Sequence, residues 1–143
     1  MTALSTRASI GVLLLRIAIG LAFMQHGWPK IQHPASWMGA HAFAPPWLQA
    51  AAAIVEFCGG IALVLGLLTP LVAALIGIDM LTAIFTVHVP MGAHWVGGPG
   101  SFETPLFYLV AMIALLLTGP GRYSIDAMIL RMTGRPVSVT PRR

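Results

Sequence analysis

Residues 8–27 have the sequence ASIGVLLLRIAIGLAFMQHG, an apolar run in which Arg16 is the only charged side chain. Three further apolar runs cover about residues 47–68, 70–90 and 103–119. A helix needs about 20 apolar residues to cross the hydrocarbon core of a bilayer, with a range of about 17 to 25. The fourth run lies at the lower limit of that range, and all four are too long and too uniform for membrane strands. The sequence therefore predicts four membrane-spanning helices.

The composition of the 143-residue chain agrees with this prediction. Charged residues make up 8% and hydrophobic residues 57%, and the mean hydropathy is +0.85. A soluble domain carries about 25% charged residues, so these few charges do not cover a soluble surface. Disordered chains are poor in apolar residues and are excluded as well. We expect one domain, residues 1–143, whose fold class is all-α: an integral membrane four-helix bundle.

The positions of the basic residues predict how the chain is oriented in the membrane. Arg7 precedes the first run, whereas residues 28–46 contain only Lys30 and residues 91–103 contain no Lys or Arg. The other basic residues outside the runs follow the fourth run and are Arg122, Arg131, Arg135, Arg142 and Arg143. Because Lys and Arg concentrate on the cytoplasmic side, both termini are predicted to be cytoplasmic. No basic patch interleaved with aromatic residues is present, so nucleic acid is not an expected partner.

A short amphipathic helix is predicted at about residues 124–133. Ser124 suits an N-cap and Asp126 suits the first turn. An apolar stripe follows at the spacing i, i+3, i+4, i+7, formed by Ile125, Met128, Ile129 and Met132. We expect this C-terminal helix to lie on the cytoplasmic leaflet of the lipid bilayer.

Three ionisable residues fall deep within the predicted spans, namely Arg16, Glu56 and Asp79. At 1.5 Å per residue, each lies ~12–14 Å from its membrane surface, so the three are expected to form one cluster. Two carboxylates beside one Arg would share a proton and titrate as a unit. Gly59 and Gly60 follow Glu56 on the same helix face and would let another helix approach closely. The cluster is either a structural staple between helices or a proton-coupled catalytic site.

Two threonines share the helix face of Asp79. Thr82 and Thr86 follow it at i+3 and i+7. Their hydroxyls either contact a bound cofactor or bond back to carbonyl groups of their own helix.

Two histidines lie at matching outer ends of predicted spans. His26, which follows Gln25, ends the first span, and His88 nearly ends the third. They could donate to a quinone carbonyl, exchange protons or, less favourably, ligate a haem. They could also simply bond to a loop or to water at the interface. At 100° per residue, Asp79 and His88 are about 180° apart on their helix, which argues against one pocket holding both.

The sequence contains no recognisable redox centre. Cys58 is the only cysteine, so no intrachain disulfide or dithiol pair can form. The histidines outside the spans lack the tight spacing of metal ligands, so no metal site is predicted. Any electrons would have to come from a partner.

Four stretches resemble the DoxX family of bacterial integral membrane proteins. They are RIAIGLAFMQHGWPKI at 16–31, EFCGGIALVLGLLTP at 56–70, GIDMLTAIFTVH at 77–88 and LLLTGPGRYSID at 115–126. The resemblance covers roughly residues 9–130. It implies a location in the bacterial inner membrane.

The resemblance also implies a redox-associated function. The family is similar to the small membrane subunit of thiosulfate:quinone oxidoreductase, and other members assemble into complexes that act in oxidative stress. The first hypothesis is therefore a membrane subunit that binds quinone at Arg16, Glu56 and Asp79, with His26 and His88 at the outer mouth. The fold is also similar to receptor-assembly chaperones, so a non-enzymatic scaffold is an alternative. A proton-linked transporter is the third, although no inverted repeat supports it. Expected partners are a second copy of the chain or a redox subunit.

Overall fold

The computed structural model describes residues 4–98 and 100–133. Its helices are α1 (Thr6–Gln32), α2 (Pro46–Leu65), α3 (Thr69–Ala83), α4 (Glu103–Thr118) and α5 (Ile125–Met132). A π-helical segment, Ile84–His88, continues α3, and a 3-10 turn, Gly39–His41, lies between α1 and α2. The described residues contain helices and no strand, so the predicted all-α class is confirmed. Arg135, Arg142 and Arg143, which contributed to the predicted orientation, lie outside the described residues.

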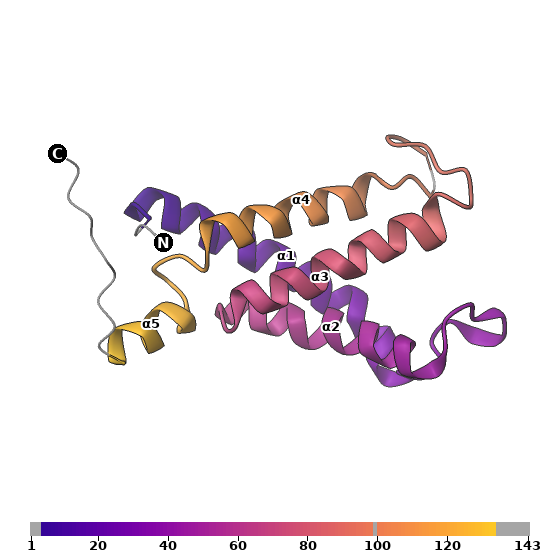
Figure 1. Ribbon diagram of the computed structural model, residues 1–143, viewed down its shortest axis with the longest axis horizontal. Coiled ribbons are helices and arrows are strands. Elements are labelled where there is room, and N and C mark those ends of the chain that lie inside the picture. Colours follow the sequence, from indigo (N-terminus) through magenta and orange to yellow (C-terminus); the bar gives the residue numbers. More distant parts are fainter. Residues whose placement is uncertain (1–3, 99, 134–143) are drawn as a thin grey trace.

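Helices α1 to α4 run along the long axis of the molecule (Figure 1). One end carries α5 and is called the α5 end, and the other carries the α1–α2 and α3–α4 loops and is called the loop end. Three helices are long and apolar enough to cross a membrane: α1, α2, and α3 together with its π-helical extension. Helix α4 has 16 residues and is the shorter apolar helix.

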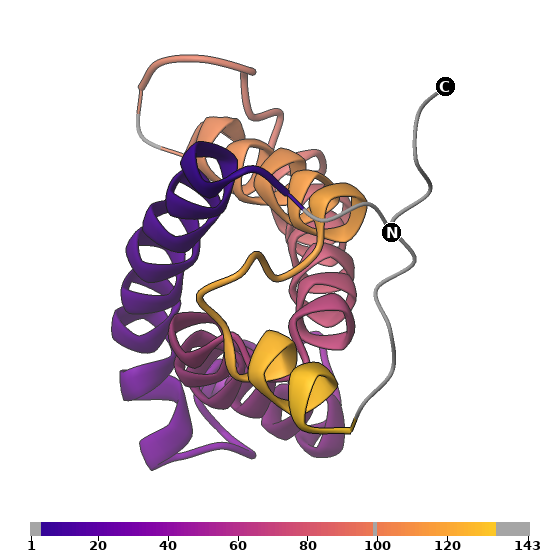
Figure 2. The ribbon, with the colours of Figure 1, turned by 90° about the vertical axis from the view of Figure 1, so that its left-hand side faces the viewer.

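Viewed along the bundle, α1 lies beside α2, α2 beside α3, and α3 beside α4 (Figure 2). The interior is apolar, and its buried members are Val12, Ile19, Phe23, Leu63, Val72, Ala73, Ile76, Met80, Met112 and Leu115. The outward faces are also apolar, for example at Leu14, Ile78 and Leu117. Helices that are hydrophobic on every face are typical of proteins surrounded by lipid.

The closest helix pair, α1 and α2, meets at two glycines. A Cβ atom built on Gly60 would lie 2.7 Å from the backbone oxygen of Gly20, so neither helix tolerates a side chain there. Gly59 instead faces α3, where a Cβ would contact Ile76 and Val72 at 3.4 Å. Small residues permit such close approach in membrane bundles. The expectation of a close helix approach is confirmed at Gly60, whereas at Gly59 a side-chain Cβ would make ordinary van der Waals contact with α3.

Helix α1 is longer than the sequence analysis predicted. Gly27 and Pro29 are typical of a helix end, yet α1 continues to Gln32. Pro29 lies close to the C-terminal end of α1, so it interrupts little of that helix's hydrogen-bond ladder. The last turns of α1 are held by their contact with α2. A Cβ on Gly27 would lie 2.5 Å from the backbone nitrogen of Phe57. As a result, Lys30 lies in the last turn of α1 and not in a loop.

The α5 end is closed by the linker between α4 and α5, which crosses the end of the bundle (Figure 2). Ser124 caps α5 by accepting from Ala127 N at 3.0 Å, which confirms the predicted N-cap. Asp126 has a second function, because it accepts hydrogen bonds from Leu68 N at 2.7 Å and Thr69 N at 2.8 Å. Its carboxylate thereby caps the first turn of α3. The apolar side chains of α5 remain exposed, namely Met128, Ile129, Leu130 and Met132.

Candidate functional site

Arg16 is fully buried and makes its hydrogen bonds only with backbone carbonyl groups. Its Nε donates to Leu63 O at 3.0 Å, and Nη2 donates to Val64 O at 3.2 Å and Tyr123 O at 3.1 Å. Nη1 donates to Pro120 O. The guanidinium therefore joins α1 to the end of α2 and to the linker.

The expected cluster of Arg16 with Glu56 and Asp79 does not form. Counting residues from the span ends placed Arg16, Glu56 and Asp79 at similar depth. That count treated the residues after α4 as lying outside the bundle. The linker instead folds over the α5 end and supplies carbonyls to Arg16. Gly66 makes room for the guanidinium, since a Cβ there would lie 2.6 Å from Arg16 Cζ. The position of Arg16 fits a structural staple.

Glu56 is paired with Lys30. The Lys30 ammonium donates to Glu56 Oε1 and also lies 4.5 Å from the centroid of the Trp37 ring. Glu56 is only 4% exposed. Asp79 on α3 lines the same cavity as Glu56. Glu56 Oε2 and Asp79 Oδ2 are buried and find no hydrogen-bond partner in the described part of the chain. We call Lys30, Glu56 and Asp79 the charged triad.

The charged triad lies in the wall of a cavity between α2, α3 and the α1–α2 loop, called the α2–α3 cavity. Its volume is ≈ 340 Å³. Most of the wall is apolar, including Phe43, Leu48, Val55, Leu75, Ile78 and Val87. Thr82 and Thr86 also line it, but their hydroxyls donate to Ile78 O at 2.9 Å and to Thr82 O at 2.6 Å. Of the two roles considered for these threonines, the structure shows the bond to their own helix.

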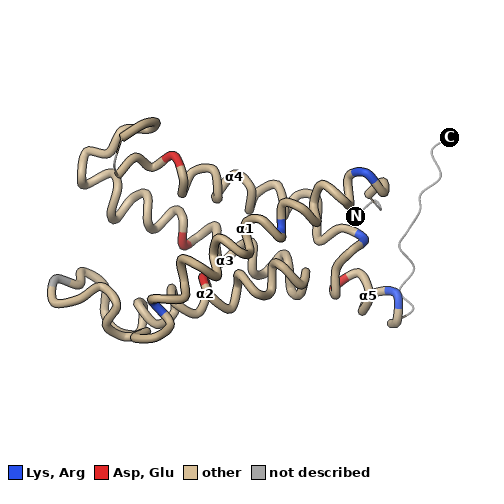
Figure 3. The backbone as a smooth tube through the Cα atoms, turned by 180° about the vertical axis from the view of Figure 1, so that it is seen from behind, with Lys and Arg blue, Asp and Glu red and all other residues tan. Residues whose placement is uncertain are grey.

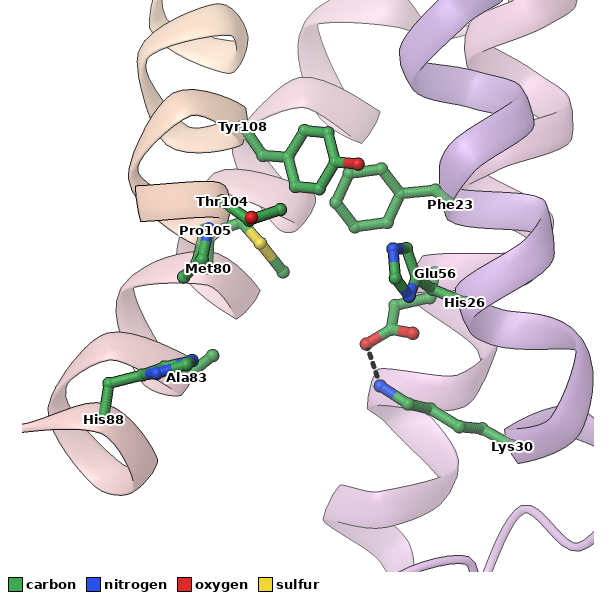
Figure 4. Close-up of a pocket in the computed structure, with 10 residues that line it drawn as sticks. All are labelled: Phe23, His26, Lys30, Glu56, Met80, Ala83, His88, Thr104, Pro105 and Tyr108. Atoms are coloured by element: carbon green, nitrogen blue, oxygen red, sulfur yellow. Dashed lines mark hydrogen bonds and ion pairs between the residues drawn. The ribbon is translucent and has the colours of Figure 1, made fainter. Parts of the chain in front are cut away.

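A second cavity, called the central cavity, lies between α1, α3 and α4 and has a volume of ≈ 180 Å³. Its wall includes His26, His88, Thr104 and Tyr108 (Figure 4). Tyr108 and Phe23 point toward each other, with ring centroids 5.0 Å apart. His88 Nδ1 donates a hydrogen bond to Gly100 O at 2.8 Å.

Both cavities touch the same ion pair. Lys30 and Glu56 contribute to the wall of each, whereas Asp79 lines only the α2–α3 cavity. The two cavities therefore meet at one buried carboxylate. Such a group is a functional candidate by default within a membrane.

The structure brings most of the predicted site residues to these two cavities, and two lie elsewhere. Gln25 is exposed and lines neither, and Arg16 lies at the α5 end. The helical-wheel argument against one pocket holding both Asp79 and His88 is confirmed, because Asp79 lines the α2–α3 cavity and His88 lines the central cavity. His88 ends a π-helical segment, as shown by the bond from Val89 N to Ile84 O at 2.9 Å.

Sequence reasoning missed Lys30 and Tyr108. Lys30 lies four residues after His26, so an α1 continued past Gly27 would have placed both on one face. Tyr108 carried no signal beyond an apolar run. Within the described residues, no group of three or more His, Cys, Asp or Glu is arranged to hold a metal ion. Cys58 is exposed on the surface of α2.

An all-helical chain with apolar outward faces and a buried charged triad belongs to the class of helical membrane proteins. The DoxX family profile matches residues 11–89, and the chain belongs to the DoxX family.

The relatives of the chain agree with that class. It is 33% identical to "Inner membrane protein YqjF" of Escherichia coli, over 84% of this chain and 92% of that protein. It is 33% identical to "Uncharacterized membrane protein Rv3486" of Mycobacterium tuberculosis, over 80% and 78% of the two chains. It is 30% identical to "Putative oxidoreductase CatD" of Bacillus subtilis, over 85% and 89%. No solved structure gives a significant match to the chain.

Proposed function

We propose that this chain is the membrane subunit of a redox-associated complex and binds a quinone or a similar lipid-soluble carrier in the α2–α3 cavity. The observation that carries the proposal is the charged triad in a mostly apolar wall. Ligand pockets have volumes of about 300–1,000 Å³ and combine apolar walls with a few polar groups, and this cavity fits that description. The name of the Bacillus subtilis relative, a putative oxidoreductase, supports a redox role.

Within this proposal the carrier's head group lies against Glu56 and Asp79, and its apolar body lies along α2 and α3. Lys30 balances one of the two carboxylate charges. The carboxyls hold or release protons as the carrier changes state, while the partner subunit supplies or removes electrons. His26 and His88 line the central cavity on the other side of the ion pair. In this proposal they link the ion pair to the loop end of the molecule.

The proposal is tested by titrating decylubiquinone and its quinol into the protein in lipid nanodiscs by calorimetry, with empty nanodiscs as the blank. We expect at least one of the two forms to bind, and Asp79→Asn to weaken that binding at least tenfold. Thr82→Val is the matched control, because the Thr82 hydroxyl is already bonded to Ile78 O. Absence of binding by both forms, or binding unchanged by both Asp79→Asn and Glu56→Gln, contradicts the proposal.

We further propose that α1 to α4 all cross the bacterial inner membrane, with both termini in the cytoplasm and α5 on the inner leaflet. Helix α4 is about 24 Å long at 1.5 Å per residue, so its ends use the interfacial region. Arg7, Arg122 and Arg131 lie at the α5 end, as the positive-inside rule requires of a cytoplasmic face. The name of the Escherichia coli relative, an inner membrane protein, supports this location.

A second candidate function, a scaffold or assembly protein, is favoured by the loop end. Large apolar side chains are exposed there, namely Phe43, Trp47, Met91, Trp95 and Val96. This face would dock a redox subunit or a second copy of the chain. Purification from native membranes separates the candidates: a stoichiometric partner without any bound carrier supports the scaffold, and co-purified quinone or quinol supports the carrier site.

A further inference from the structure

The central cavity is lined mainly by polar side chains. They come from α1 and α2 on one side and from α4 and the π-helical segment on the other (Figure 4). These residues are His26, Lys30, Glu56, His88, Thr104 and Tyr108. A lipid chain in this cavity would leave their polar groups without hydrogen-bond partners, which is costly within a membrane. The wall therefore favours a polar occupant.

Much of the hydrogen-bonding capacity of this wall is open to such an occupant. Among the described residues, the side-chain hydrogen bonds in the wall run from Lys30 to Glu56 and from His88 Nδ1 to Gly100 O. They leave the imidazole of His26 and the hydroxyls of Thr104 and Tyr108 to bond elsewhere. A neutral imidazole and a hydroxyl can each donate and accept, as water does.

The size of the central cavity suits a small cluster of water molecules. Its volume is ≈ 180 Å³. One water molecule takes about 30 Å³ in the liquid, so the cavity has room for about six. Polar cavities of this kind hold water, whereas apolar cavities stay empty.

The wall changes from exposed to buried between the loop end and the ion pair. His26 and Thr104 are exposed, His88 is half-buried and Glu56 is only 4% exposed. Thr104 is the second residue of α4, and His88 is the last residue of the π-helical segment, so both lie beside the α3–α4 loop. The mouth of the cavity therefore lies at the loop end, and the ion pair forms its buried end.

We propose that the central cavity is a water-filled inlet that carries protons between the loop end and the Lys30–Glu56 ion pair. Groups that both accept and donate, such as the His26 imidazole and the Tyr108 hydroxyl, pass a proton along such a path. A proton delivered by hydronium converts the Glu56 carboxylate into a neutral carboxyl beside the Lys30 ammonium, and the reverse step returns it to water.

This inference rests on the proposed function for the use of those protons. The α2–α3 cavity reaches the same ion pair from the other side. A carrier bound there would exchange protons with water at the loop end and not with water at the α5 end. The inference thus adds the aqueous side to which the carrier site is connected.

Water access is tested with silver ion, which reacts with thiols and is small enough to follow water. Met80→Cys and Leu81→Cys are made in a Cys58→Ser background and placed in nanodiscs. The two positions are adjacent on α3, but Met80 lines the central cavity and Leu81 is 40% exposed on the outside of the bundle. We expect silver to block maleimide labelling of Met80→Cys at least tenfold faster than that of Leu81→Cys. Equal rates, or a faster reaction at Leu81→Cys, overturn the inference.

The position of the mouth is tested by filling it. Thr104→Trp should slow the silver reaction of Met80→Cys at least fivefold. Thr118→Trp, at the other end of α4, is the matched control and should leave the rate unchanged. Slowing by Thr118→Trp alone would place the entrance at the α5 end and overturn the inference.

Proton delivery is followed by time-resolved infrared difference spectra after a pH step, without any cysteine variant. Glu56→Gln and Asp79→Asn assign the carboxyl bands, and His26→Phe distinguishes the imidazole signal. We expect Thr104→Trp to slow the change in the Glu56 band at least tenfold. An unchanged rate, or no band from Glu56, overturns proton delivery to the pair. Neither measurement uses the carrier, so failure here leaves carrier binding intact, whereas failure of carrier binding alone overturns only the proposed function.

Discussion

The buried ionisable side chains of this chain divide into two kinds by how fully they are hydrogen-bonded. Arg16 donates to four backbone carbonyls and is 1% exposed. Glu56 and Asp79 each keep a buried oxygen without a partner in the described residues. A satisfied buried cation stabilises a fold, whereas an unsatisfied buried acceptor costs free energy that is expected to be offset by function. The distinction supports a structural role for Arg16 and the proposed binding role for the two carboxyls.

Arg16→Lys tests the structural role. A lysine keeps the charge but cannot reproduce the fork that reaches carbonyls of both α2 and the linker. We expect the free energy of unfolding to fall by about 2–4 kcal/mol, since at least two buried carbonyls lose their donor. The measurement is SDS-induced unfolding in mild detergent.

Arg122→Lys is the matched control for that variant. Arg122 is exposed, and its described side-chain hydrogen bond goes to Thr6 at 3.2 Å. The free energy of unfolding of Arg122→Lys should stay within about 0.5 kcal/mol of the wild-type value. If Arg16→Lys and Arg122→Lys lower the free energy of unfolding equally, Arg16 is not a structural staple.

At the scale of elements, two local irregularities position the site. The π-helical segment after α3 turns His88 toward the central cavity, and π-helical turns are frequent at functional sites. The continuation of α1 past Pro29 brings Lys30 to Glu56. Both irregularities are held by contacts between helices, so neither is visible in the period of apolar residues along one segment.

Asp126→Ala tests how α5 is attached to α3. The variant removes the acceptors for Leu68 N and Thr69 N. Loss of an N-cap costs about 1–2 kcal/mol, so the free energy of unfolding should fall by that amount. Hydrogen exchange should also accelerate at the Leu68 and Thr69 amides. Glu103→Ala, in the first turn of α4, should leave exchange at those two amides unchanged, and faster exchange there would contradict a local cap.

Across the whole molecule, basic residues gather at the α5 end, whereas other charged residues lie within the apolar bundle (Figure 3). The α5 end combines basic residues with the amphipathic α5, and the loop end exposes aromatic side chains. The two cavities lie toward the loop end, where both are lined by the ion pair of Lys30 and Glu56. This division fits a protein with one face toward cytoplasmic lipid head groups and the other toward a partner.

The orientation is tested with single cysteines in a Cys58→Ser background. Ser101→Cys in the α3–α4 loop should react with a membrane-impermeant maleimide in spheroplasts, and Ser5→Cys should react only after permeabilisation. Ser36→Cys in the α1–α2 loop should behave like Ser101→Cys. Labelling of Ser5→Cys in intact spheroplasts would reverse the orientation, and different labelling of the two loop positions would contradict the even number of spans.

The sequence predicted much of the fold and part of the site. The positions of α2 to α5, the Ser124 cap and the close approach at Gly60 follow from local pattern and residue size, and the structure confirms them. The grouping of Arg16 with Glu56 was wrong. Depth along a span does not show which other groups, here the carbonyls of the linker, lie near enough to bond the same side chain. Lys30 was missed because proline and glycine normally end a helix.

Hydropathy and helix length act locally along the chain, so the bundle of apolar helices with few charges is predictable from the residues alone. The partners of those charges depend on how the helices pack. A guanidinium bonds whichever carbonyls the linker brings near it, and a carboxylate pairs with whichever ammonium a neighbouring helix presents. These pairings depend on close helix contacts and on the path of the linker, and they place Lys30, Glu56 and Asp79 together while Arg16 holds the opposite end of the bundle.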